Sequence, residues 1–222
     1  MRADLREART RRVRAMNHIL KKLYPQPVIA LNHSNTWELL VAVVLSAQCT
    51  DERVNRVTKT LFKKYPTIVS YRDASQEDME RAIFSCGFYR NKAKNIRNAA
   101  RVIMEHYNGE VPRTMSELLT IPGVARKTAN VILSNVFQLH EGIAVDTHVR
   151  RFAIRFNLTD YTNPIQIERD LMCIMPRSEW WYFNHRLVHY GRDYCPARKH
   201  DCNNHPLTTI YPEACMVWPK AH

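Results

Sequence analysis

IPGVARKTANV, residues 121–131, places a Pro-Gly turn between two predicted helical segments and puts an amine, Lys127, just inside the second. AVDTH follows at residues 144–148, so Asp146 lies nineteen positions after that lysine, at the start of a third segment. A turn that opens a helix offers backbone N–H groups to a phosphate. An amine beside a bound phosphodiester can attack a sugar carbon, and a nearby carboxylate can support that attack. The pattern therefore indicates chemistry on a nucleic acid.

The composition favours a helical protein with a basic surface. Lys and Arg number 33 against 21 Asp and Glu, an excess of 12 over 222 residues, and such a positive field suits a polyanion. Hydrophobic residues make up 45% of the chain, as in an ordinary folded protein. Five glycines and few alternating β-branched runs favour helices over sheets. The alternative interpretation is that the protein is incidentally basic and that its charge indicates no nucleic-acid partner.

The first twenty residues are basic rather than apolar. MRADLREARTRRVRAMNHIL is basic but has no continuous apolar core, so we expect neither a secretory signal peptide nor, anywhere in the chain, a membrane span. The six cysteines are then expected to stay reduced. The expected location is the cytoplasm, with association to the nucleoid if the source is bacterial or archaeal.

Capping signals and hydrophobic periodicity predict helices along most of the chain. Asn35 precedes Glu38 by three positions and opens the apolar run WELLVAVVLSAQ, which predicts a central helix buried on nearly all sides. Thr114 and Glu117 have the same spacing and predict a short helix before the Pro-Gly turn. Further helices are expected at residues 4–24, from 51, 76–85, 90–106, 126–137, around 149–156, and twice within 164–190. The tail, 195–222, lacks periodicity and is expected to be a loop.

Four motifs make the chain resemble endonuclease III, the helix-hairpin-helix family of DNA glycosylases and abasic-site lyases in base excision repair. They follow in the order and nearly the spacing of that family: LSAQCTDERVN at 45–55, GFYRNKAKNI at 87–96, IPGVARKTANVIL at 121–133 and AVDTHVRRF at 144–152. The resemblance implies an all-α fold of two helical lobes with DNA bound in the cleft between them. Residues 29–140 would form a helical barrel with the hairpin motif at about 114–137. Residues 1–28 and 141–222 would form the other lobe.

The resemblance assigns the chemistry to two residues. Lys127 would attack the anomeric carbon of a flipped nucleotide, expel the base and form a Schiff base, after which elimination of the 3′ phosphate nicks the strand. Asp146 would stabilise positive charge at the sugar or relay protons. Each residue also has a plainer interpretation. Lys127 would be one more phosphate-contacting lysine, and Asp146 an ordinary helix N-cap.

The resemblance also implies how DNA is held. The hairpin, from Ile121 through Gly123 to Ala125, would bind phosphate through backbone N–H groups, with Arg126 beside it. Ala125 replaces the second glycine of the family and requires a backbone that tolerates a Cβ atom. Gln48 would fill the gap left by the flipped base, and Phe88 would wedge between bases of the opposite strand.

Plainer interpretations remain open for several of these positions. Phe88 is a core residue in the alternative interpretation, because aromatic side chains are mostly buried. Asp51 matches a family position near the cleft, or is an N-cap. Four basic residues of one predicted helix would contact backbone phosphate or simply be solvated: Arg90, Lys92, Lys94 and Arg97. Three cysteines within helical segments are expected to be core thiols: Cys49, Cys86 and Cys173.

The tail departs from the family pattern, which has four cysteines spaced six, two and five residues apart around a [4Fe–4S] cluster. Cys195 and Cys202 have the first spacing, but His205 and Tyr211 occupy the next two positions. One possibility is that the cluster is lost and Tyr211, Trp218 and the prolines hold the tail. The others are an iron–sulfur cluster with unusual ligands, or a zinc ion, on the same four residues. Those four residues are Cys195, Cys202, His205 and Cys215. The catalytic step requires none of these cofactors.

The sequence thus predicts a bifunctional enzyme, acting as a monomer on double-stranded DNA with no membrane partner. The resemblance implies that it removes damaged bases, most of all oxidised pyrimidines, and cuts the resulting abasic site by β-elimination. A glycosylase of the same fold with another base preference, or one that acts mainly as an abasic-site lyase, is one alternative. A helix-hairpin-helix protein that binds DNA without catalysis is the other, and the presence of both Lys127 and Asp146 argues against it.

Overall fold

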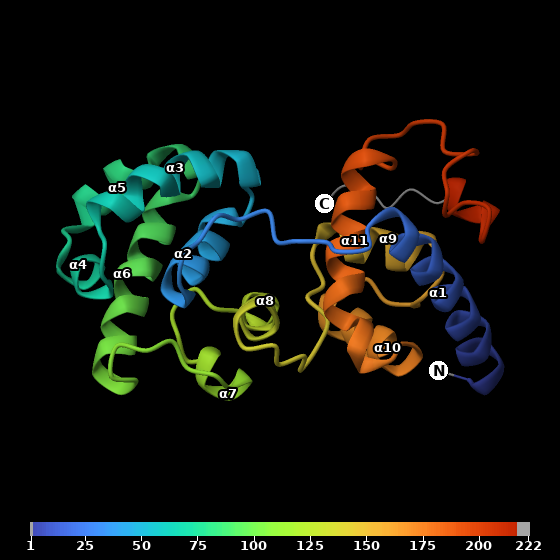
Figure 1. Ribbon diagram of the computed structural model, residues 1–222, viewed down its shortest axis with the longest axis horizontal. Helices are drawn as coiled ribbons and strands as arrows, with labels where there is room; N and C mark the ends of the chain where they lie inside the picture. Colours follow the sequence, from blue (N-terminus) through green and yellow to red (C-terminus); the bar gives the residue numbers. More distant parts are fainter. Residues whose placement is uncertain (1, 217–222) are drawn as a thin grey trace. The chain divides into compact units, whose positions relative to one another are not determined.

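The computed structural model describes residues 2–216, which form eleven α-helices and no strands, so the prediction of an all-α fold is confirmed (Figure 1). The chain divides into two compact units. One is Ile29–Glu141, and the other joins the segment up to Val28 with the segment from Gly142 onward. None of the described helices combines the length and apolar character that crossing a membrane requires.

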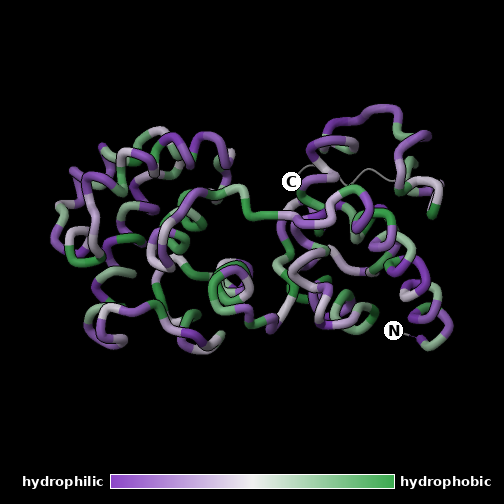
Figure 2. The backbone as a smooth tube through the Cα atoms, viewed as in Figure 1, coloured by the Kyte–Doolittle hydropathy of each residue, from purple (hydrophilic) through white to green (hydrophobic). Residues whose placement is uncertain are grey.

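The unit Ile29–Glu141 is built around α2, which packs against α3, α6 and α8 (Figure 1). Every residue of α2 from Leu39 to Leu45 is buried, and hydropathy colouring shows the helix as mainly hydrophobic (Figure 2). The prediction of a central buried helix is therefore confirmed. The helices of this unit are α2 (Thr36–Ser46), α3 (Asp51–Lys64), α4 (Ile68–Asp73), α5 (Gln76–Ile83), α6 (Tyr89–His106), α7 (Met115–Leu118) and α8 (Arg126–Val136), with the 3₁₀ turn η1 (Phe84–Cys86) before α6.

Side-chain caps set where these helices begin. Asn35 Oδ1 accepts a hydrogen bond from Glu38 N at 2.9 Å, and Glu38 Oε2 accepts from Ser34 N at 2.6 Å. Each bond satisfies a backbone donor that the first turn of a helix leaves without an intrahelical partner. Thr114 caps α7 in the same way through Glu117 N. Both predicted capping pairs are confirmed.

The second unit places α11 against α1 and α9, with α10 packed on α1 and α9. Its core is rich in aromatic side chains, and the rings of Phe152 and Tyr190 meet edge-on with centroids 5.4 Å apart. Its helices are α1 (Ala3–Leu23), α9 (Thr147–Arg155), α10 (Pro164–Ile174) and α11 (Trp180–Asp193), with 3₁₀ turns η2 (Arg177–Glu179) and η3 (Pro212–Cys215).

Three local predictions differ from the structure. The helix α4 was not predicted, because its sequence IVSYRD is short and β-branched; a capping box between Thr67 and Ser70 begins it. Cys173 is exposed, so its interpretation as a core thiol is wrong, whereas Cys86 is buried. Asp51 is the first residue of α3, and the N-cap is Thr50, whose hydroxyl accepts from Arg53 N at 3.4 Å.

Glu179 joins α1 to α11 through polar contacts of its carboxylate. Its carboxylate accepts hydrogen bonds from Asn17 at 2.8 Å and Arg186 at 3.0 Å, and pairs with Lys21. Burial raises the pKa of this carboxyl, but the hydrogen bonds from Asn17, Lys21 and Arg186 outweigh burial and hold the pKa below its usual value. Because the folded-state pKa lies below the unfolded-state pKa, the ionised carboxylate of Glu179 adds to the free energy of unfolding at pH values above the unfolded-state pKa. This contribution is lost as the pH falls through the folded-state pKa and the carboxylate becomes protonated.

We therefore expect the free energy of unfolding to decrease from about pH 7 to about pH 3.5. In Glu179→Gln, this decrease should be smaller by about 1 kcal/mol than in the unaltered protein. Urea denaturation of both proteins at the two pH values measures the difference. Glu110→Gln, at an exposed position, is the matched control and should behave like the unaltered protein. Equal pH dependence in Glu179→Gln and the unaltered protein would contradict the prediction.

Candidate active site

The hairpin between α7 and α8 is a tight turn fixed by two buried side chains. Val124 N donates to Ile121 O at 3.0 Å, and both side chains enter the core. Gly123 has φ +83°, a backbone that favours glycine, and a Cβ atom there would lie 3.0 Å from Asn95 Cβ, so Asn95 would also have to move. Ala125 has φ −96°, which any residue adopts, so replacement of the second family glycine leaves the turn intact.

The first turn of α8 lacks a side-chain cap. Ala125 occupies the N-cap position without a side-chain oxygen, and the first turn has no acidic residue. Its N–H groups and the positive end of the helix dipole therefore suit an anion such as a phosphate. The role of the hairpin as a backbone clamp stays a prediction, and the uncapped start of α8 is compatible with it.

Lys127 is the second residue of α8 and is half-buried. The next two residues, Thr128 and Ala129, are buried and anchor the helix in the core of the unit. Lys127 therefore lies in the uncapped first turn of a helix whose following residues are buried, and its side chain is partly accessible. This arrangement suits a nucleophile that must reach a sugar attached to a bound phosphate.

Asp146 lies in the other unit and is the N-cap of α9. Its Oδ1 accepts a hydrogen bond from Val149 N at 2.8 Å, so its interpretation as a cap is confirmed. The preceding residues, 143–145, are buried, and Asn184 Nδ2 donates to Ala144 O at 2.6 Å. The cap engages one carboxylate oxygen and fixes the direction of the side chain. A cap and a catalytic role are therefore compatible.

The two residues expected to enter DNA are both exposed at loops of the unit Ile29–Glu141. Phe88 has 65% of its surface exposed, so its interpretation as a core residue is wrong. Gln48 follows the end of α2 and is also exposed. Both have left-handed backbone, with φ 46° and 52°, which is strained for side chains of this size.

The basic residues of α6 do not form one solvated face. Arg90 and Lys94 are exposed. Arg97 instead donates to Ala74 O at 2.7 Å, within its own unit. Lys92 is 5% exposed, so the expectation that it contacts phosphate or is solvated is wrong. Sequence alone does not reveal this, because the groups that bind Lys92 come from distant segments.

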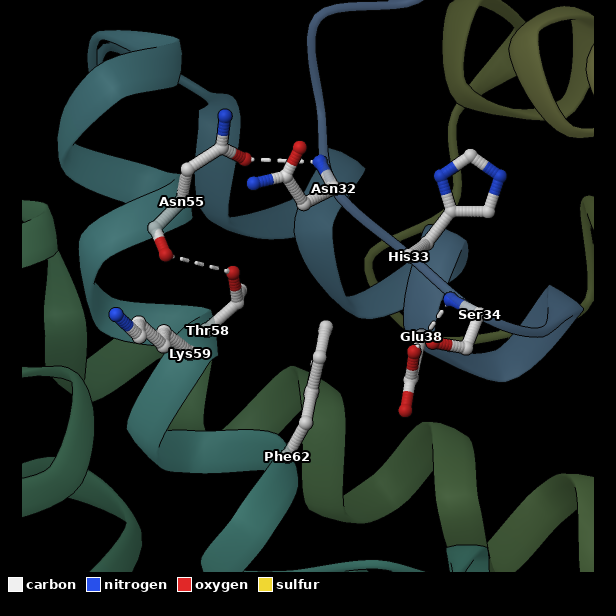
Figure 3. A pocket seen from close by; sticks show the side chains of 8 residues that line it. All are labelled: Asn32, His33, Ser34, Glu38, Asn55, Thr58, Lys59 and Phe62. Atoms are coloured by element: carbon white, nitrogen blue, oxygen red, sulfur yellow. Dashed lines mark hydrogen bonds between the residues drawn. The ribbon is translucent and has the colours of Figure 1, made fainter.

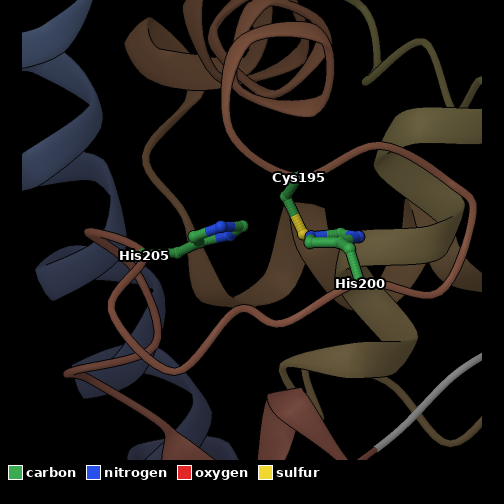
Figure 4. A group of neighbouring side chains, drawn as sticks. All are labelled: Cys195, His200 and His205. Carbon is green, nitrogen blue, oxygen red and sulfur yellow. The ribbon is translucent and has the colours of Figure 1, made fainter.

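The tail brings together a different set of metal donors from the one expected. Cys195, His200 and His205 place one ligand atom each within 4.8 Å of one another, and their side chains face a common space (Figure 4). His205 Nδ1 is buried, with no hydrogen-bond partner among residues 2–216. Cys202 and Cys215 do not belong to this group. His200, five residues from each partner, was missed because only the cysteine spacing of the family was followed.

A [4Fe–4S] cluster does not fit these residues. Such a cluster takes four thiolates, and its third and fourth positions here are His205 and Tyr211. The Tyr211 ring instead lies under the guanidinium of Arg12, with 4.0 Å between its centroid and Cζ. Packing of Tyr211 on its lobe was one expectation for a tail without a cluster. Trp218, the other aromatic residue named there, lies outside the described residues.

Arg155 also occupies the position between the first two cysteines. Its guanidinium is buried and donates to Cys195 Sγ at 2.9 Å, Cys202 Sγ at 3.1 Å and Ala214 O at 2.7 Å. Arg151, one turn earlier on α9, donates to Cys195 O at 2.8 Å. Two arginines of α9 therefore hold the tail through hydrogen bonds.

A hollow of about 440 Å³ lies elsewhere on the unit Ile29–Glu141, beside the start of α2 (Figure 3). Asn55 Oδ1 accepts from Asn32 N at 2.9 Å and Asn55 Nδ2 donates to Ala30 O at 2.8 Å, so this side chain holds the incoming segment on α3. None of the residues predicted for catalysis or DNA binding lines the hollow.

Comparison with known proteins gives consistent matches. Residues 41–177, more than half of the chain, match the HhH-GPD superfamily base excision DNA repair protein family. Endonuclease III of Synechocystis sp. is 50% identical over 196 residues, covering 88% of this chain and 90% of that protein. Endonuclease III of Bacillus subtilis is 46% identical over 189 residues, covering 85% of this chain and 86% of that protein.

Solved structures agree. The structure of a trapped covalent intermediate between endonuclease III and DNA superposes with a TM-score of 0.88 at 43% identity, covering 92% of this chain and 96% of that one. A thermostable thymine-DNA glycosylase superposes with a TM-score of 0.76 at 19% identity and covers 92% of this chain and 95% of that one. The second likeness concerns the fold alone.

Proposed function

The chain belongs to the HhH-GPD superfamily of base excision DNA repair proteins, and from this premise we propose that Lys127 and Asp146 carry its chemistry. It is an enzyme of the endonuclease III type, a DNA glycosylase and abasic-site lyase that acts on damaged bases. The observation that carries the assignment is the position of Lys127, in the first turn of α8 directly after the glycine-dependent hairpin.

The hairpin supports phosphate binding without sequence preference, because it uses backbone N–H groups. With the phosphodiester held there, the neutral amine of Lys127 attacks C1′ of the damaged nucleotide. The C1′–N bond breaks, and the base leaves with its electron pair and takes up a proton. The sugar ring opens, and the C1′–Nζ linkage becomes a protonated Schiff base.

The Schiff base makes the next bond labile. Loss of a C2′ proton moves electrons toward the iminium, and the C3′–O bond then breaks with the phosphate as leaving group. Water hydrolyses the imine and releases the amine of Lys127. A related endonuclease III forms a covalent intermediate with DNA, which supports a covalent route for this chain.

Asp146 is the proposed partner of this reaction. A carboxylate stabilises the positive charge that develops at the sugar, or accepts and returns protons as the ring opens. The hydrogen bond from Val149 N holds the side chain in one orientation, so no reorganisation is needed as charge develops.

Gln48 and Phe88 are proposed to replace the flipped nucleotide in the stack. Extruding a base costs a few kcal/mol of stacking and pairing, and an inserted side chain offsets part of that cost. Their exposure on loops supports this role. The proposed substrates are oxidised pyrimidines in double-stranded DNA, and the proposed compartment is the cytoplasm.

The function is tested with matched duplexes that contain one thymine glycol, one 8-oxoguanine or no damage. We expect release of thymine glycol and a nick whose 3′ end carries the unsaturated aldehyde of β-elimination. Faster release of 8-oxoguanine would favour a different base preference. Tight binding of every duplex without release or nicking would favour the non-catalytic alternative.

For the tail, we propose a single zinc ion on Cys195, His200 and His205. The three donor atoms lie within 4.8 Å of one another, so small side-chain movements would let one zinc ion bind all three, and a water molecule would supply the fourth ligand that zinc ordinarily takes. Mixed sulfur and imidazole ligands suit zinc. The ion would order the tail and has no part in the attack by Lys127.

We expect the purified protein to be colourless and to hold about one zinc and no iron by elemental analysis. His200→Ala should lose the zinc, whereas the matched control Cys202→Ser should keep it. Four iron atoms per chain would contradict the zinc proposal, and also the conclusion that a [4Fe–4S] cluster does not fit the residues of the tail. Absence of zinc, or equal zinc in His200→Ala, would also contradict the proposal.

A further inference from the structure

The loops that carry Gln48 and Phe88 lie against each other and share an unusual backbone. Gln48, Gly87 and Phe88 all have φ between 46° and 54°. A Cβ atom built on Gly87 would lie 3.9 Å from Gln48 O, which places the two loops in direct contact. Residues in this conformation persist only where the surrounding structure imposes it.

Lys92, in the first turn of α6, supplies that constraint. Its Nζ donates to Leu45 O at 2.9 Å and Ala47 O at 2.7 Å, at the end of α2, and to Cys86 O in the second loop. Its own N–H donates to Phe88 O at 3.1 Å. All three ammonium donors are thus used within the unit, and the positive charge lies at the negative end of the α2 dipole.

We propose that Lys92 is a positioning residue for base flipping, whose ammonium ties the two loops together so that Gln48 and Phe88 enter the duplex as one rigid unit. The inference rests on the proposed roles of Gln48 and Phe88. Restacking of the duplex opposes the inserted side chains of Gln48 and Phe88. Flexible loops would allow both side chains to be displaced, and the flipped nucleotide would then return to the stack. A single strand has no paired duplex to open and makes no such demand.

The test compares cutting of one abasic site in a duplex and in the single strand of the same sequence, under single-turnover conditions. For Lys92→Met, we expect the duplex rate to fall at least about tenfold and the single-strand rate to stay within about twofold. With 2-aminopurine opposite the site, the fluorescence change on binding should shrink, because it reports insertion. Lys63→Met, an exposed lysine of α3, is the matched control and should change neither rate.

Two further variants keep the test decisive where loss of three hydrogen bonds prevents Lys92→Met from folding. Lys92→Arg keeps the charge but displaces the carbonyl groups, and should lower the duplex rate selectively, by a smaller factor. Gly87→Ala strains the second loop without a clash and should give the same selective loss. The role of Lys92 would be overturned if every variant that folds lost the same factor in cutting rate on the duplex and on the single strand. It would also be overturned if none of these variants lost cutting rate on the duplex. Failure of the unaltered protein to cut either substrate would instead overturn the proposed function.

Discussion

Lys127→Gln is expected to form no borohydride-trapped adduct with abasic DNA. Its rates of base release and strand cutting should fall at least about 10³-fold, which corresponds to a loss of about 4 kcal/mol of transition-state stabilisation. Glutamine keeps a polar side chain of similar length but has no nucleophilic amine. No Schiff base can then form. Gel analysis after borohydride reduction detects the adduct, and single-turnover assays measure both rates.

The neighbouring Arg126→Gln is the matched control for Lys127→Gln. It removes one positive charge beside the same hairpin, so we expect weaker and less salt-sensitive DNA binding but a normal adduct at saturating protein. Lys127→Gln should still bind the duplex in fluorescence anisotropy. An adduct in Lys127→Gln would show that the nucleophile is another residue. Loss of the adduct in Arg126→Gln at saturation would show that the adduct depends on the positive charge beside the hairpin as well as on the amine of Lys127.

Asp146→Asn is expected to lower the single-turnover rate of base release by about 10²-fold with little change in stability. Asparagine caps helices as well as aspartate does, so α9 keeps its first turn while the negative charge is lost. Asp146→Ala should lose the same activity and also about 1 kcal/mol of unfolding free energy, because the hydrogen bond from Val149 N disappears. Urea denaturation and rate measurements on both variants separate the two roles.

Asn163→Ala provides the control for losing a cap in the same unit. Asn163 caps α10 by accepting from Ile165 N at 2.9 Å, so its removal should cost similar stability and leave the rate unchanged. An Asp146→Asn protein with an unaltered rate would reduce Asp146 to an N-cap alone.

The sequence predicts those parts of the fold that local signals specify. Asn35 and Thr114 begin their helices through side chains three residues from the donors they satisfy, and such spacing is visible in the chain. The helix α4 was missed because its β-branched residues oppose a helical interpretation while tertiary packing supports one. Its capping pair, Thr67 and Ser70, was the available signal.

The sequence identifies the hairpin and AVDTH because their spacing lies within short segments. It does not identify Lys92, whose partners lie near residues 45–47 and at residue 86 and meet only in the folded unit. A lysine in a basic run looks solvated until burial is known. The expectation for the tail followed the family spacing, which leads from Cys202 to His205 and Tyr211, with Cys215 four residues further on, so His200 was not considered. No local signal shows that Arg155 binds two of the sulfurs.

The central claim is that the amine of Lys127 forms the bond to DNA. The most direct test reduces the complex of the unaltered protein and an abasic duplex with borohydride, digests it, and locates the modified residue by mass spectrometry. The account predicts one adduct, on Lys127. Attachment to any other amine, or no adduct from a protein that still cuts the strand, would contradict it.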